Sequence, residues 1–202
     1  MRLEAMAITM PEVAGHPNRT PFEGVLTLVD QPSTRPPSGA RGHRVILTRE
    51  AAKEALPSLL GMAVDYAPKW DGHDARAKCG IITTANVMGD QLQVSGYLFG
   101  RDFPEVISQL QQGYAGQMGM SYELADAHVA DMRAEVWTLT RATFTGAAIL
   151  LRDKAAYRNT SFHLARCRNS SQLHAATTRL SARAAWRHAS PICGTTQRRK
   201  EA

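Results

Sequence analysis

The sequence predicts an α+β fold in which a mainly antiparallel β-sheet or barrel forms the core and two or three helices flank it. Three observations support this prediction. Short apolar segments with two-residue alternation recur along the chain, two of them are joined by turn residues, and helical periodicity is confined to two places. The length of 202 residues suits one domain with a hydrophobic core.

The expected strands are rich in apolar residues and alternate between two faces. In chain order they cover residues 4–10, 22–29, 44–47, 81–87, 92–99, 118–124 and 136–145. The turn at 88–91 joins two of them as a hairpin. Residues 62–66 are apolar and expected to be buried, and the segment 146–151 continues the apolar character of the last strand. Residues 125–133 are interpreted as a polar excursion.

Two segments carry helical signals. Thr48 is placed to cap a helix that runs to about Leu60, and Pro57 predicts a break in its last turn. Asp102 is the expected N-cap of a second helix, which ends at Gly113. An apolar stripe on the second helix is expected to face the core, and it consists of Phe103, Val106, Ile107 and Leu110.

The basic character of the chain belongs to its C-terminal end. The net charge is +6, yet residues 151–202 hold 11 Lys and Arg against 2 acids, while residues 1–150 hold 13 against 16. We therefore expect a domain over residues 1–163 and a basic, poorly ordered tail over residues 164–202. The sequence shows neither an aromatic stacking array nor a recognition helix, so we expect no nucleic-acid partner apart from the tail.

The sequence also indicates which cellular compartment to expect. No apolar run approaches the roughly 18 residues of a membrane span, and Glu4 interrupts the apolar N-terminus where a signal peptide needs its core. The three cysteines, Cys79, Cys167 and Cys193, are widely spread and form neither a disulfide framework nor a zinc pattern. We expect a protein that is not secreted, has no membrane partner and needs no cofactor.

One expected strand places a serine on a supported surface. Alternation along residues 118–124 puts two methionines, a tyrosine and a leucine on one face, and Gly119, Ser121 and Glu123 on the other. A serine beside a glycine, opposite an apolar face, can be approached by a substrate. On spacing alone, an ordinary strand with a polar outer face explains the pattern as well.

The strand around Ser121 and the upstream loop Asp71–Asp74 resemble those of the prohead (capsid maturation) proteases of tailed phages, which are relatives of the herpesvirus assemblin proteases. The resemblance runs over about residues 22–161 and includes three further stretches: Gly39–Val45, Gly61–Tyr66 and Phe144–Tyr157. It implies an assemblin-like form of the predicted fold. It also implies a serine endopeptidase that processes scaffold and capsid-protein segments during phage head maturation.

The resemblance implies Ser121 as the nucleophile and His73 as the general base. A serine hydroxyl is essentially never ionised at neutral pH, so the imidazole must take its proton and pass it to the leaving amine. The sequence Gly119-Met-Ser121-Tyr-Glu123 lacks the second glycine of the α/β-hydrolase nucleophile elbow, which excludes that class.

The third, imidazole-orienting residue departs from the family pattern. The resemblance places it on the strand after the serine strand, where Arg141 stands, and a guanidinium cannot accept an imidazole proton. Asp131 and Glu135 are the nearby acids. The enzyme either works as a Ser–His dyad, or takes an acid from elsewhere, or is impaired. Arg152 lies in the expected oxyanion region.

The resemblance further implies the major capsid protein and scaffold segments as partners, with a homodimer as an expected assembly. The implied location is the host cytoplasm, inside the procapsid. The alternative function is a non-catalytic assembly or scaffold protein derived from such a protease, which Arg141 favours. A metal site at Asp71, His73 and Asp74 competes with the general-base role of His73, but a solvated acidic loop explains these residues and we expect no metal.

Overall fold

The computed structural model describes residues 6–8, 10, 11, 13, 15–114 and 116–165. A 9-stranded sheet forms the body of this part of the chain. The strands are β1 (Met6–Ala7), β2 (Thr20–Leu28), β3 (Arg44–Leu47), β4 (Ala63–Tyr66), β5 (Lys78–Met88), β6 (Gln91–Leu98), β7 (Met118–Val129), β8 (Val136–Leu151) and β9 (Ser161–Leu164). The helices are α1 (Arg49–Ala55) and α2 (Pro104–Gln112), with short 3-10 helices η1 (Leu56–Leu59) and η2 (Arg152–Lys154). The predicted α+β class is confirmed.

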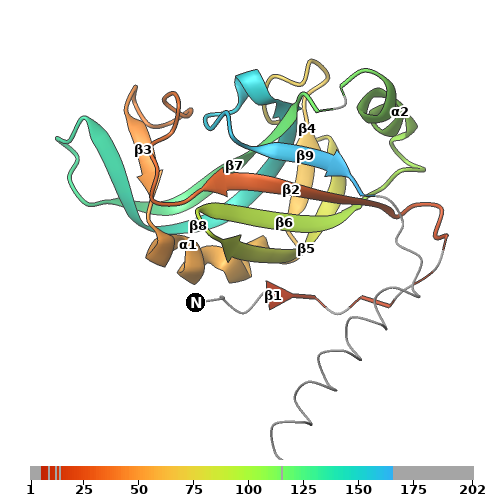
Figure 1. Ribbon diagram of the computed structural model, residues 1–202, viewed down its shortest axis with the longest axis horizontal. Coiled ribbons are helices and arrows are strands. Elements are labelled where there is room, and N and C mark those ends of the chain that lie inside the picture. The colour runs from red at the N-terminus through yellow and green to blue at the C-terminus, as the bar shows by residue number, and fades with distance from the viewer. Residues whose placement is uncertain (1–5, 9, 12, 14, 115, 166–202) are drawn as a thin grey trace, which may run out of the picture. The chain divides into compact units, whose positions relative to one another are not determined.

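The sheet is mainly antiparallel and strongly curled. Its order is β3-β8-β4-β5-β6-β2-β9, with β7 paired to β8 and β1 paired to β5. Only the pairings of β8 with β3 and with β4 are parallel among the described strands. The curl brings β2 and β9 against β7 without a ladder between them, so the described sheet stops short of a closed barrel (Figure 1).

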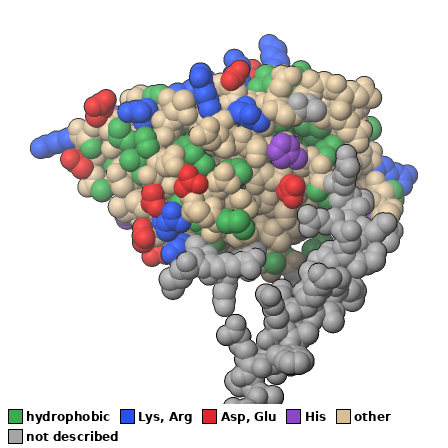
Figure 2. All heavy atoms as spheres, in the orientation of Figure 1, with side chains coloured by type: hydrophobic (Ala, Val, Ile, Leu, Met, Phe, Trp, Pro, Cys, Tyr) green, Lys and Arg blue, Asp and Glu red, His purple; other side chains and the backbone are tan. Residues whose placement is uncertain are grey.

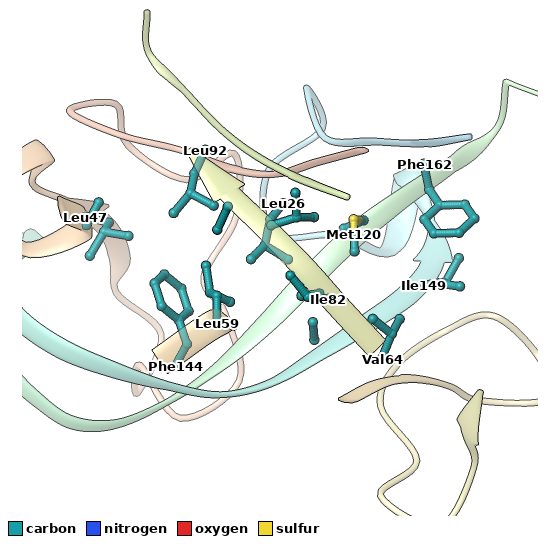
Figure 3. Close-up of a cluster of buried hydrophobic side chains, with 14 of the residues drawn as sticks. Leu26, Leu47, Leu59, Val64, Ile82, Leu92, Met120, Phe144, Ile149 and Phe162 are labelled. Carbon is teal, nitrogen blue, oxygen red and sulfur yellow. The ribbon is translucent and has the colours of Figure 1, made fainter. Parts of the chain in front are cut away.

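The core fills the concave side of the sheet, with α1 and η1 packed against β8 and β5. Figure 3 shows its centre, where Leu26, Ile82 and Met120 from three strands meet Leu59 and Phe144. Both methionines of the serine strand are buried, which confirms the predicted apolar face of β7. The opposite face of β8 carries a second, small cluster that consists of Ala148, Leu150 and Ala155.

The capping and proline signals in the sequence predicted the helices correctly, except for the N-cap of α2. The Thr48 side chain accepts a hydrogen bond from the Ala51 N–H at 3.2 Å, and η1 replaces α-helix around Pro57, as expected. The N-cap prediction for Asp102 is wrong. The helix α2 begins with Pro104 at its first position, and the Asp102 carboxylate instead accepts a hydrogen bond from Asn18 at 2.7 Å.

Two predicted boundaries also change. The segment 125–129, expected to be a polar excursion, continues β7, because β8 supplies ladder partners as far as Leu139. A short strand, β9, covers 161–164, where no periodicity was visible, and it pairs with β2. Leu164 therefore lies in the sheet, one residue beyond the expected domain end. The predicted basic tail lies, from residue 166 onward, outside the described residues. Within the described ranges, no helix is long and apolar enough to cross a membrane.

The molecular surface over β2 and β6 is mostly neutral in the view of Figure 2, with few Lys and Arg side chains. The basic net charge of the chain is thus not displayed as a patch over these strands. This agrees with the uneven charge distribution in the sequence, in which residues 1–150 hold more acids than bases.

Candidate active site

Strand register brings Ser121 and a buried aspartate into one row across the sheet. Ser121 of β7 pairs with Ala148 of β8, and Ala148 pairs in turn with Asp65 of β4. Lys78 of β5 continues the row as the partner of Asp65. Laterally paired residues project to the same face of a sheet. Ser121 and Asp65 therefore share the face opposite the main core, two strand spacings or about 10 Å apart.

His73 reaches this face from the loop between β4 and β5. Trp70 anchors the loop: it is buried, its Nε1 donates to Gln109 Oε1 at 2.8 Å, and its carbonyl accepts from the Leu151 N–H at 2.8 Å. The Trp70 backbone has a φ of 55°, in the left-handed region. A bulky residue in this conformation is strained and persists only where the surroundings hold it. The loop therefore has a defined position on the sheet.

The imidazole of His73 lies between two carboxylates. Its Nδ1 is 3.4 Å from Asp65 Oδ1 and 3.8 Å from Glu123 Oε1, so the ring bridges β4 and β7 across β8. Both ring nitrogens are buried and have no hydrogen-bond partner among the described residues. With Nδ1 turned to the carboxylates, Nε2 is the nitrogen left for another group. No hydrogen bond joins His73 to Ser121 in this part of the chain, so their catalytic contact stays a prediction.

Asp65 is held as a carboxylate although its side chain is fully buried. Burial alone would raise the pKa of Asp65, but the close approach of the His73 imidazole and the hydrogen bond and charge of Lys78 outweigh it and lower the pKa below its usual value. The Lys78 ammonium donates to Oδ2 at 2.7 Å, and the Asp74 N–H donates to Oδ1 at 3.3 Å. A buried, ionised carboxylate next to an imidazole can orient the ring and stabilise an imidazolium ion.

Glu123 is the weaker neighbour of the same imidazole. Its side chain is 50% exposed, so solvent screens its charge. It lies across Gly146 of β8, where a Cβ atom would come 2.5 Å from Glu123 Oε2. The missing side chain at Gly146 therefore makes the room that lets Glu123 approach His73.

Arg152 lies next to the serine strand, as the oxyanion prediction requires. An ideal Cβ at Gly119 would lie 3.2 Å from Arg152 Cα and 2.5 Å from Thr160 Oγ1, so only glycine allows this approach. Arg152 Nη2 donates to Gly116 O at 2.7 Å, and its Nε is buried without a partner in the described structure. Its role at an oxyanion stays a prediction.

The two acids considered near Arg141, Asp131 and Glu135, are not among the carboxylates that approach His73, which corrects the third-member candidates. Asp131 is exposed in the turn between β7 and β8, where it accepts from the Arg133 N–H, and Glu135 lies in the same turn. Eight strand residues, about 26 Å, separate this turn from Ser121. Arg141 pairs with His128 rather than with Ser121, so it does not occupy the orienting position.

Sequence reasoning missed Asp65 and undervalued Glu123. The segment 62–66 was expected to be simply apolar and buried, yet a carboxylate is rarely buried without a partner. A lone aspartate in the run Ala63-Val-Asp65-Tyr66 was therefore a usable signal of a buried charge pair. Glu123 was visible on the face of Ser121, but the distance to His73 depends on the loop geometry.

The competing metal site gains no geometric support at Asp71, His73 and Asp74. No group of three metal-ligating side chains occurs within the described ranges. Asp74 instead turns its backbone N–H to Asp65 and its carboxylate to the Arg76 N–H.

Fold and site together define a β-rich α+β domain with a histidine set between a buried aspartate and the serine strand. No family model matches the chain. No curated protein matches it either. Among solved structures, it is similar to the KSHV protease, crystallised in complex with a hexapeptide phosphonate inhibitor. The identity is 11%, the match covers 80% of this chain and 76% of that chain, and the TM-score is 0.45. At this level of identity, the site has to be judged from the residues of this chain.

Proposed function

We propose that this protein is a serine endopeptidase in which Ser121 attacks the peptide bond, His73 is the general base and Asp65 orients the imidazole. One observation carries the proposal. The buried Asp65 carboxylate lies 3.4 Å from His73 Nδ1 and in the same sheet row as Ser121. A nucleophile, a base and an orienting acid on one supported face are the elements of acyl-transfer catalysis.

The geometry supports a definite order of proton movements. As Ser121 Oγ bonds to the substrate carbonyl carbon, its proton passes to His73 Nε2, and the ring becomes an imidazolium ion. Asp65 stabilises that ion without taking the proton, because its lowered pKa keeps it ionised. The imidazolium then gives the proton to the leaving amine as the C–N bond breaks. Water repeats the sequence to release the acyl group from Ser121.

The developing oxyanion needs donors that are in place before the reaction. Arg152 supports this requirement, since its Nε carries an N–H that is not used within the described structure and its backbone abuts Gly119. Lys78 contributes indirectly. It keeps Asp65 ionised when His73 is neutral, so the carboxylate is ready before the imidazolium forms.

We further propose that the substrates are segments of scaffold and major capsid protein, cleaved inside the procapsid in the host cytoplasm. This part rests on the sequence resemblance to phage prohead proteases around Ser121 and His73. A homodimer is the proposed assembly on the same basis.

A non-catalytic assembly protein is the second candidate. One observation favours it: His73 has no hydrogen bond to Ser121 in the described structure, although catalytic hydrogen bonds are often loose before substrate binds. A degenerate site would keep the fold and a partner-binding role while losing cleavage.

A cleavage assay separates the two functions. Purified full-length protein is incubated with a proteome-derived peptide library and with a co-expressed capsid-protein fusion, and new termini are mapped by mass spectrometry. The protease proposal predicts new termini with wild-type protein and none with Ser121→Ala. Cleavage that persists in Ser121→Ala contradicts the assignment of Ser121 as the nucleophile. No cleavage of either probe contradicts the protease proposal and favours the assembly role.

A further inference from the structure

The loop that joins β2 to β3 is long but fixed near its middle. It covers residues 29–43, all of them described, and contains no helix and no named strand. Loops of this kind that exceed about 12–15 residues usually have a function. The Ser33 side chain is buried. The Ser33 N–H donates to Val45 O at 2.8 Å, and Ser33 Oγ accepts from the Val45 N–H at 3.0 Å, so the loop is attached to β3 immediately before Arg35.

Arg35 binds the backbone of the segment that follows β8. We call residues 152–160, which begin with η2, the η2 segment. Arg35 Nη2 donates to Asp153 O, and Arg35 Nε donates to Ala155 O at 3.1 Å. The backbone N–H groups of Thr34 and Arg35 both donate to Ala156 O, at 2.8 and 3.3 Å. The ion pairs of the described residues do not include Arg35, so its guanidinium serves here to hold carbonyl groups.

The η2 segment is attached to the serine strand at both of its ends. At its first residue, the Arg152 N–H donates to Gln117 O at 2.9 Å, immediately before β7. At its last residue, Thr160 Oγ1 accepts from the Met120 N–H at 3.3 Å. These two contacts place the segment beside the part of β7 that leads into Ser121.

The middle of the η2 segment packs on the same face of the sheet as Ser121. Ala155 is buried in the small cluster that includes Ala148 of β8. Ala148 is the ladder partner of Ser121, so both project to the face opposite the main core. Arg35 therefore binds the carbonyl group of a residue that packs on the catalytic face. Without that contact, the η2 segment is free to shift, and Arg152 shifts with it relative to Ser121.

We propose that Arg35 is a positioning residue for the proposed reaction, which acts through the η2 segment and holds Arg152 beside Ser121. This inference rests on the proposed protease function. A planar guanidinium offers several donors in a fixed geometry and so holds two carbonyl groups of one turn, whereas an ammonium is a point charge. The loop between β2 and β3 thereby becomes part of the machinery of the site.

The first test measures kcat and KM of full-length variants on the best peptide of a proteome-derived library. Arg35→Ala should lower kcat about 10- to 100-fold, because a misplacement of about 1 Å costs up to this much in rate. KM should stay within about threefold of wild type, since the lost interaction acts in the transition state. Arg35→Lys keeps the charge but not the planar fork, so it should lower kcat nearly as far. Arg41→Ala removes an exposed arginine from the same loop and should leave kcat unchanged.

A double-variant cycle tests whether Arg35 acts through Arg152. In an Arg152→Ala background, adding Arg35→Ala should lower kcat by less than about threefold, because the group that Arg35 positions is already absent. A residue that only supports the fold would lower kcat by the same factor in both backgrounds.

Amide hydrogen exchange gives a readout that does not depend on cleavage. In Arg35→Ala, the N–H groups of residues 152–160 should exchange at least about tenfold faster than in wild type, because the segment opens locally. Residues 91–98 of β6 should keep their rates.

The outcomes separate this role from the protease proposal. Wild-type kcat in Arg35→Ala or Arg35→Lys, equal factors in the two backgrounds, or unchanged exchange over residues 152–160 overturns the positioning role and leaves the protease proposal intact. If β6 also loses its protection, Arg35→Ala has unfolded, and the kcat of Arg35→Lys decides. No cleavage by wild-type protein overturns the protease proposal and this role with it.

Discussion

Replacing Asp65 by asparagine removes the negative charge that faces both His73 and Lys78. The amide has the shape of the carboxylate but cannot stabilise an imidazolium ion at His73. A full charge pair at 3.4 Å with an effective dielectric constant of about 20 is worth about 5 kcal/mol. The Lys78 ammonium, 2.7 Å from the same carboxylate, offsets part of this. Since each 1.36 kcal/mol is tenfold in rate, we expect kcat to fall roughly 10²- to 10³-fold.

Glu123→Gln is the matched control. It makes the same chemical change at a carboxylate 3.8 Å from the same His73 nitrogen, but one that is half exposed. Screened surface pairs are worth at most about 1 kcal/mol, so kcat should fall by less than about fivefold. The contrast between the two variants isolates burial as the cause of the difference.

Stability has to be followed in parallel, because Asp65→Asn leaves Lys78 without its buried partner. The Lys78 side chain is 36% exposed, so solvent screens its unpaired ammonium, and the loss of stability should be smaller than that of a fully buried pair, about 3–5 kcal/mol. The double variant Asp65→Asn with Lys78→Met removes the unpaired ammonium, so it should recover stability without recovering activity. The assay is kcat on the best library peptide, with urea unfolding of each variant. A folded Asp65→Asn enzyme within threefold of wild type, or a Glu123→Gln enzyme that is the more impaired, refutes the assignment.

Three further predictions concern the supports of the site. Gly119→Ala places a methyl group against Thr160 and the Arg152 backbone. We expect it to lower the free energy of unfolding by about 1–3 kcal/mol and to reduce cleavage. A melting curve that does not change would contradict the close approach. Gln109→Ala leaves the buried Trp70 N–H unpaired, so it should cost about 1–3 kcal/mol and lower kcat more than KM, measured by thermal unfolding and kinetics. Because the folded pKa of Asp65 is lowered, its stabilisation is complete above the unfolded pKa of about 4 and is lost as pH falls below it. Urea unfolding between about pH 4 and pH 2 should therefore show a steeper loss for wild type than for Asp65→Asn, and equal slopes would contradict the shift.

Local chemistry in the sequence predicted most of the fold. The cap at Thr48, the break at Pro57 and the alternation that buries Met118 and Met120 all depend on neighbouring residues, and each is confirmed. The strand β9 was not predictable in this way, because four residues show no sustained period and the pairing with β2 spans more than a hundred residues.

The residues of the candidate site also differ in whether the sequence could predict them. Ser121 and His73 were found by resemblance, and the strand face of Ser121 follows from alternation. The orienting acid was sought near Arg141, on the strand after the serine strand, at Asp131 and Glu135, whereas long strands carry those residues away from Ser121. Asp65 reaches the site through the parallel pairing of β4 with β8. The two strands are far apart in the sequence, so no short segment determines their register.

Covalent labelling of the serine tests the central claim most directly. Full-length protein is treated with an alkyl fluorophosphonate, and the modified residue is identified by peptide mass spectrometry. We predict a single label on Ser121, with a rate that falls at least about 100-fold in His73→Ala, the lower bound for loss of a general base. His128→Ala removes an exposed histidine of the same strand region and should leave the rate unchanged. Labelling that avoids Ser121, or that proceeds equally well without His73, would contradict the account.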